Sequence, residues 1–298
     1  MKFLLPSLCM FATLTVYGQR TCTHLAVQDV FFTAPPSNRH FASTKSSFQA
    51  KKMISGDFTE AKALKLLFGN YGRYTDCDDT RLCAKWRLTK GEVESAELGE
   101  AFFASNDWTV YTRAVMAKTF VQDGRERFIL IMQTSPPQYG CHACAPVMGA
   151  ATFSKVANDW QLENQTKLIT RIGSFGQIPA GQLVKIGPDK YGVLFQLGDM
   201  HQGVSNECLI LIAELRNAIK TILPATELGE DNGGFCGKET GPCYSYRSRF
   251  EFVPRRVPDY FNFVIRTKGT KQNERGSIVQ VHDIRTYVFS NDRYSLRK

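Results

Sequence analysis

The chain has 298 residues, of which 43% are hydrophobic and 12% aromatic, and its formal net charge is +9 at pH 7. That composition excludes a wholly disordered chain, because it holds enough apolar side chains for a buried core. The length allows one large β domain or two smaller ones.

Residues 1–18 have the layout of a secretory signal peptide. A short basic start, Met1-Lys2, precedes an apolar run from Phe3 to Val16, and a cleavage site with small flanking residues follows Gly18. The apolar run is too short to span a bilayer, and no later run approaches the ~20 apolar residues of a membrane helix. We therefore predict an exported protein, periplasmic or extracellular, with no transmembrane segment after removal of the signal peptide.

Residues 19–90 are predicted to form an N-terminal segment with one short helix and a disulfide-closed loop. Asp57 and Glu60 have the spacing of a capping box, with Asp57 as the N-terminal cap. The apolar residues that follow share one helical face, and Gly69 occupies the position of a C-terminal cap. This pattern predicts a helix over residues 58–68.

Residues 91–298 are predicted to form an antiparallel β domain. Runs of aromatic and β-branched residues are separated by turn residues, as at Gln122-Asp123-Gly124 and Asn291-Asp292. The segment from Leu209 to Leu223 fits either a helix or a hairpin, and its β-branched residues favour the hairpin. The fold class is therefore mainly β: an antiparallel, hairpin-rich sandwich, barrel or propeller-like sheet with one short N-terminal helix.

The cysteines are predicted to form disulfides. Nine are present, and Cys9 would leave with the signal peptide, so eight remain in the exported chain. An even number of cysteines in an exported protein indicates disulfide bonds, although spacing alone does not settle how they pair. Three local pairs stand out, Cys77 with Cys83, Cys141 with Cys144 and Cys236 with Cys243, and Cys22 and Cys208 are left over.

Most of the positive charge lies near the C-terminus. Residues 244–298 contain twelve Lys and Arg but five Asp and Glu. Between Tyr246 and Phe252 apolar and charged residues alternate, which predicts a strand with one apolar and one charged face. Such strands either form a solvated face or contact an anionic envelope component, glycan or lipid surface, with nucleic acid disfavoured. The predicted binding residues are Arg247, Arg249, Arg255 and Arg256.

The motif Cys141-His142-Ala143-Cys144 has two opposing interpretations. A C-x-x-C motif is typical of thiol–disulfide oxidoreductases, in which a lowered thiol pKa produces the attacking thiolate. Tyr139-Gly140 before it and Ala145-Pro146 after it do not provide the strand and helix of such enzymes, so a structural disulfide is favoured. A soft metal site would also need Met148 and Met200-His201 nearby, which nothing in the sequence indicates. We predict no bound metal and no cofactor.

Enzyme signatures are weak in this chain. The run Gly173-Ser-Phe-Gly176 is one residue short of a nucleophile elbow, and the phosphate-binding and zinc-protease motifs are missing from the sequence. Acidic residues such as Glu92 and Glu94 could supply a carboxylate pair for glycoside hydrolysis, but sequence cannot pair them. We predict no catalytic residue and interpret the chain as an exported, non-enzymatic, disulfide-containing binding or envelope-interaction protein. The alternatives are a redox or metal-handling protein that uses residues 141–144, and a secreted hydrolase with dispersed carboxylates.

Overall fold

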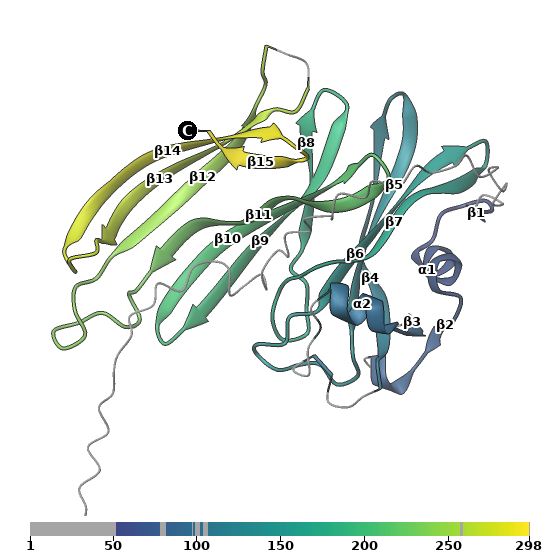
Figure 1. Ribbon diagram of the computed structural model, residues 1–298, viewed down its shortest axis with the longest axis horizontal. Coiled ribbons are helices and arrows are strands. Elements are labelled where there is room, and N and C mark those ends of the chain that lie inside the picture. The colour runs from purple at the N-terminus through teal and green to yellow at the C-terminus, as the bar shows by residue number, and fades with distance from the viewer. Residues whose placement is uncertain are drawn as a thin grey trace, which may run out of the picture.

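The structure, a computed structural model, describes residues 52–77, 82–96, 98, 102–103, 107–256 and 259–297. The predicted signal peptide and Cys22 lie outside the described residues. The described chain is built mainly from antiparallel strands in two sheets (Figure 1). The predicted fold class, mainly β with hairpin connections, is confirmed. In these ranges no helix is both long enough and apolar enough to cross a membrane.

The first sheet has seven strands in the order β1-β7-β6-β5-β4-β3-β2. Its strands are β1 (Met53–Ile54), β2 (Tyr71–Arg73), β3 (Leu82–Arg87), β4 (Thr109–Gln122), β5 (Arg125–Ser135), β6 (Val147–Val156) and β7 (Asp159–Arg171). Strands β1 to β3 come from the predicted N-terminal segment, and β1 and β3 pair with β7 and β4 of the predicted β domain. The division of the chain at residue 90 stays a prediction.

The second sheet has eight strands that follow one another in chain order. They are β8 (Gly181–Gly187), β9 (Lys190–His201), β10 (Val204–Leu215), β11 (Ala218–Asp231), β12 (Ser245–Val253), β13 (Asn262–Gln272), β14 (Ile278–Ser290) and β15 (Arg293–Leu296). The predicted hairpin between Leu209 and Leu223 is confirmed as β10 and β11. Strands β11 and β12 pair only through Gly229–Asp231 and Ser245–Arg247. The sheet therefore parts there into a middle layer, β8–β11, and an outer layer, β12–β15 (Figure 1).

The middle layer is buried on both faces. On β10, Ile210 packs with Ile131 of the seven-stranded sheet, whereas the neighbouring Leu209 and Leu211 pack with Phe263 of the outer layer. Successive side chains of a strand point to opposite faces, so one strand can serve two cores. This explains why residues 208–213 are apolar without interruption and why their pattern fitted a helix as well as a strand.

Helix α1 (Glu60–Phe68) covers the outer face of the seven-stranded sheet. Its buried Leu64 belongs to a cluster with Leu130 and Phe153 of the strands beneath. The N-terminal cap is Thr59, whose hydroxyl accepts a hydrogen bond from the Lys62 N–H at 3.2 Å, so the predicted cap at Asp57 is wrong. The extended backbone of Thr59 suits that role.

Two short helical segments were not predicted. Helix α2 (Lys90–Ser95) opens with a capping box in which the Thr89 N–H donates to the Glu92 carboxylate at 2.8 Å. A single 3₁₀ turn spans Thr75–Cys77. The glutamates near residue 92 were interpreted as candidate carboxylates for hydrolysis, and Glu92 instead stabilises a helix start.

Candidate functional site

The outer layer places basic side chains next to one another on its exposed face. In the register of β12 and β13, Arg247 lies opposite Lys268 and Arg249 lies opposite Arg266. On β14, His282 lies opposite Lys268 and continues the line. All five side chains are exposed. We call Arg247, Arg249, Arg266, Lys268 and His282 the basic row.

The inward side chains of the same strands hold the basic row in place. Phe250 and Phe252 alternate with the outward arginines, and their rings lie 5.7 Å and 5.0 Å from that of Phe263 on β13. A shift of one residue in register would exchange the two faces and expose these rings. The apolar core therefore fixes which side chains face solvent, and the alternation predicted for this strand is confirmed.

The acidic side chains of the outer layer leave most of the row without an ion pair. Arg266 is paired with Glu251 at 3.0 Å. Asp259, Asp283 and Asp292 instead pair with cations outside the row. No carboxylate of the described residues lies within ion-pair distance of the other two arginines of the row or of its lysine. These three cations are therefore available to an outside anion.

Two of the acids on β11 point away from the row. Glu227 and Glu230 accept hydrogen bonds from the hydroxyls of Tyr246 and Tyr244, on the inner face of the layer. Burial, and then these carboxylates, raise the pKa of both tyrosines. The β11 position opposite Arg247 is Gly229, which has no side chain. Asp231, the last residue of β11, does act on the row: hydrogen bonds from the Gly233 N–H and the Ser245 side chain, and then the charge of Arg247, lower the pKa of its carboxyl.

The four arginines predicted as binding residues do not form one patch. Arg247 and Arg249 lie together in the row. Arg255 and Arg256 are exposed beyond the other end of β12, about 26 Å along the strand from Arg247 at ~3.3 Å per residue. The charge of Arg255 acts on the hydroxyl of Tyr294, lowering a pKa that burial chiefly raises. The structure therefore divides the predicted set in two.

Three members of the row were missed from the sequence. Arg266, Lys268 and His282 join it only through the pairing of β12, β13 and β14. A signal was present, because Phe263 and Ile265 alternate with charged residues on β13. That alternation shows which residues share a face, but pairing decides which of them stand opposite each other.

The C-x-x-C motif forms a disulfide at one end of the molecule. Cys141 and Cys144 are bonded, with their Cα atoms 4.9 Å apart, and β6 begins three residues after Cys144, so no helix follows the motif. The turn at Gly173–Gly176 docks on this loop, because the Phe175 N–H donates to the His142 carbonyl at 3.3 Å. The segment that resembles a nucleophile elbow, Gly173–Gly176, and the C-x-x-C motif thus lie in two neighbouring loops that are hydrogen-bonded to each other.

The same loops bring part of the hypothetical metal set together. The His142 imidazole lies 3.4 Å from the Asp199 carboxylate, next in the chain to Met200-His201. Its ring also contacts the edge of the Phe175 ring, 4.8 Å away between centroids. Across the described ranges, no group of three or more His, Cys, Asp or Glu side chains has the arrangement of a metal site.

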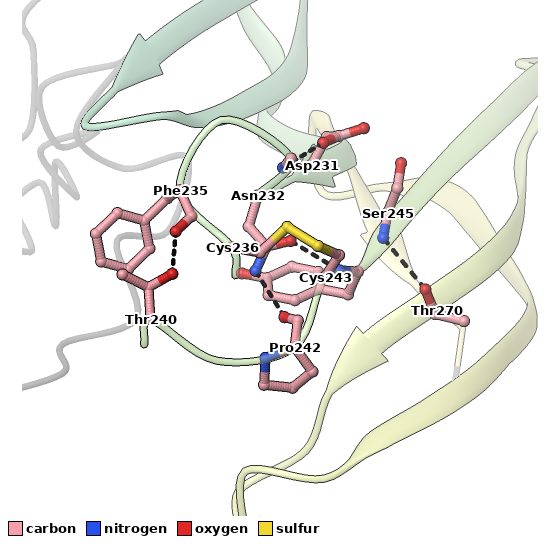
Figure 2. The surroundings of a disulfide bond; sticks show 11 residues. Asp231, Asn232, Phe235, Cys236, Thr240, Pro242, Cys243, Ser245 and Thr270 are labelled. Carbon is pink, nitrogen blue, oxygen red and sulfur yellow. Dashed lines mark hydrogen bonds between the residues drawn. A yellow bond between two sulfur atoms is a disulfide. The ribbon is translucent and has the colours of Figure 1, made fainter. Parts of the chain in front are cut away.

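The loop between β11 and β12 is closed by the disulfide Cys236–Cys243 (Figure 2). Inside it, the Asn232 amide donates to the Pro242 carbonyl at 3.0 Å, and its side-chain oxygen accepts the Tyr244 N–H at 2.7 Å. At its base the Ser245 N–H donates to the Thr270 hydroxyl at 3.2 Å. The loop is therefore tied to the start of β12, next to the basic row.

The remaining cysteines are buried. Cys77 and Cys83 are bonded beside Tyr111. Cys208 is also disulfide-bonded, and its partner lies outside the described residues. The three local pairs suggested by spacing are the pairs that the structure joins.

The chain matches no protein-family model, no curated protein and no solved structure.

Proposed function

We propose that the protein is an exported, non-enzymatic binding protein that attaches to an anionic partner through the basic row. The observation that carries the proposal is that two like-charged pairs stand opposite each other in the register of β12 and β13, Arg247 with Lys268 and Arg249 with Arg266. Like charges directly opposite each other destabilise an antiparallel pair. A bound anion would relieve that repulsion, so the arrangement suits binding better than it suits stability.

The chemistry of the row suits a partner with several negative charges. Neighbouring strands lie about 4.8 Å apart and side chains on one face recur about every 7 Å along a strand, so the cations form a closely spaced grid. Arginine can grip a carboxylate, sulfate or phosphate with two parallel hydrogen bonds. An acidic glycan and an anionic lipid surface both offer such groups.

Export is supported by the disulfides. Three described bonds in a β-rich chain are consistent with an oxidising compartment. The Cys236–Cys243 bond also closes the loop beside the basic row. The predicted signal peptide over residues 1–18 is part of this proposal.

The test compares two double charge reversals that change net charge equally. Arg247→Glu with Lys268→Glu removes the centre of the row, and Arg255→Glu with Arg256→Glu removes cations outside it. We expect the first variant to lose about tenfold or more of its binding to immobilised heparin or to phosphatidylserine vesicles, and the second to change little. Binding of the unaltered protein should weaken with added salt.

Two results would contradict the proposal. Equal losses in the two variants would mean that only net charge matters. Binding that is insensitive to salt and to both reversals would mean that the row is a solvated face. Circular dichroism of each variant shows whether it is folded.

A further inference from the structure

One line of outward side chains, Arg247, Lys268 and His282, is basic across three strands of the outer layer, whereas the outward side chains along β12 change from basic to acidic. Along β12 the outward positions run from Arg247 and Arg249 to the acidic Glu251. The residues opposite these three on β13 are Lys268, Arg266 and Val264, and those on β14 are His282, Ile284 and Thr286. A negative chain laid along β12 would meet a carboxylate within three outward positions, whereas on β12, β13 and β14 a chain laid across Arg247, Lys268 and His282 would meet three basic side chains in succession.

Two features border the basic row, one on the β11 side and one along β12. On the β11 side, the position opposite Arg247 is Gly229, where an added Cβ would lie 2.8 Å from the Tyr246 carbonyl oxygen. That position is therefore held by a residue without a side chain, and the acid that borders the basic row on this side is Asp231, whose pKa the charge of Arg247 helps to lower. Along β12, the outward basic side chains end at Glu251, which forms an ion pair with Arg266.

The outer layer is also curved. Figure 1 shows β12, β13 and β14 bending together over the middle layer, so that the face turned away from the core is convex. A flat bilayer touches a convex face at few points, whereas a flexible chain can follow it. Curvature and the direction of the charges thus favour the same kind of partner.

We infer that the anionic partner is a linear acidic polysaccharide, bound across β12, β13 and β14 with its sulfate or carboxylate groups on the basic row and with Glu251 setting one border. The inference rests on the proposed function and names its partner class and orientation. Arginine and lysine hold the anionic groups, and Glu251 repels any chain that turns along the strand.

The first experiment distinguishes an acidic polysaccharide from an anionic lipid surface as the partner. Binding of the unaltered protein is measured by calorimetry with a heparin tetrasaccharide, and by sedimentation with phosphatidylcholine vesicles containing about 30% phosphatidylserine. We expect the tetrasaccharide to bind about tenfold more tightly than the vesicles. Vesicle binding that equals or exceeds tetrasaccharide binding overturns this inference and leaves the proposed function standing. If neither probe binds, both fail.

The second experiment tests the border. Glu251→Gln removes the repelling carboxylate and releases Arg266, so we expect tetrasaccharide binding to tighten about two- to fivefold. Asp189→Asn, in the exposed turn between β8 and β9, makes the same change in net charge outside the basic row and should leave binding nearly unchanged. A purely structural role for Glu251 would not tighten binding.

Backbone amide shifts on adding the tetrasaccharide then report the orientation. We expect them on β12, β13 and β14 around Arg247, Lys268 and His282. Shifts that run down β12 past Glu251, or an unchanged affinity in the Glu251→Gln variant, contradict the orientation across the strands.

Discussion

The two outward faces of this molecule treat their cations differently. On the seven-stranded sheet, two lysines have partners: the exposed Lys155 lies 2.7 Å from the Glu126 carboxylate, and the half-buried Lys167 lies 4.6 Å from the centroid of the Trp86 ring. On the outer layer, Arg247 and Lys268 face each other with no such partner among the described carboxylates. A charged face that served only solubility would be expected to alternate its signs across strands.

The difference extends to what covers each sheet. The outer face of the seven-stranded sheet is closed by α1, and Leu130 and Phe153 beneath it are fully buried. The corresponding face of β12–β14 has no helix over it among the described residues. A covered face contributes to stability through its apolar contacts, and an uncovered face is free to bind. The comparison can be tested by changing one residue in each region.

The largest expected effect comes from the covered face. Leu64→Ala in α1 removes a side chain that is 1% exposed and leaves a cavity against the sheet. We expect the free energy of unfolding to fall by about 2–5 kcal/mol, measured by urea denaturation. Lys65→Ala, one residue along on the exposed side of the helix, should change it by less than about 0.5 kcal/mol. A small effect of Leu64→Ala would mean that α1 does not close the sheet.

The helix and its sheet show how far the sequence predicts the fold. The apolar face and the Gly69 cap predicted α1, since these signals are local and Gly69 has a positive φ of 83° that suits glycine. The N-terminal cap was misplaced by two residues because Asp57 and Thr59 are both good caps and only the tertiary entry of the chain selects one. Helix α2 was missed because six residues carry too short a pattern to stand out.

An alkaline pH should weaken the outer layer. Burial, and then the carboxylates of Asp259 and Asp292, raise the pKa of Tyr260 to about 12, against 10 in the unfolded chain. The folded state holds this proton more tightly, so its stabilisation is complete below pH 10 and is lost as the pH rises from 10 towards 12. We expect a loss of up to about 2 kcal/mol from this group.

The measurement is urea unfolding at several pH values between about 9 and 12, with Tyr260→Phe as the comparison. The variant keeps the ring that stacks on Phe289, at 3.6 Å between centroids, and removes the titrating hydroxyl. Its stability should fall less steeply with pH. Tyr244, Tyr246 and Tyr294, whose pKa values burial also raises, should continue to contribute in both proteins. Equal slopes would contradict the role of Tyr260.

The basic row was predictable only in part. Period-two alternation identified Arg247 and Arg249 as outward residues of one strand. That Lys268 and Arg266 stand opposite these arginines could not be predicted, because register depends on hairpin lengths and on packing of the inward rings. Proximity in sequence also grouped Arg255 and Arg256 with Arg247 and Arg249. The extended strand β12 separates the two pairs in space, because Arg255 and Arg256 follow its far end.

The smallest expected effect is a change in the free energy of unfolding whose sign distinguishes the basic row from an ordinary charged face. Lys268→Gln removes the repulsion with Arg247, so we expect the free energy of unfolding to rise by about 0.2–1 kcal/mol while anion binding weakens. Lys155→Gln on the seven-stranded sheet removes the attraction to Glu126 and should lower the free energy of unfolding by a similar amount. Both changes should shrink at high salt, because the side chains are exposed. If Lys268→Gln also destabilises the protein, the row is a structural feature of the sheet and its like charges need another explanation.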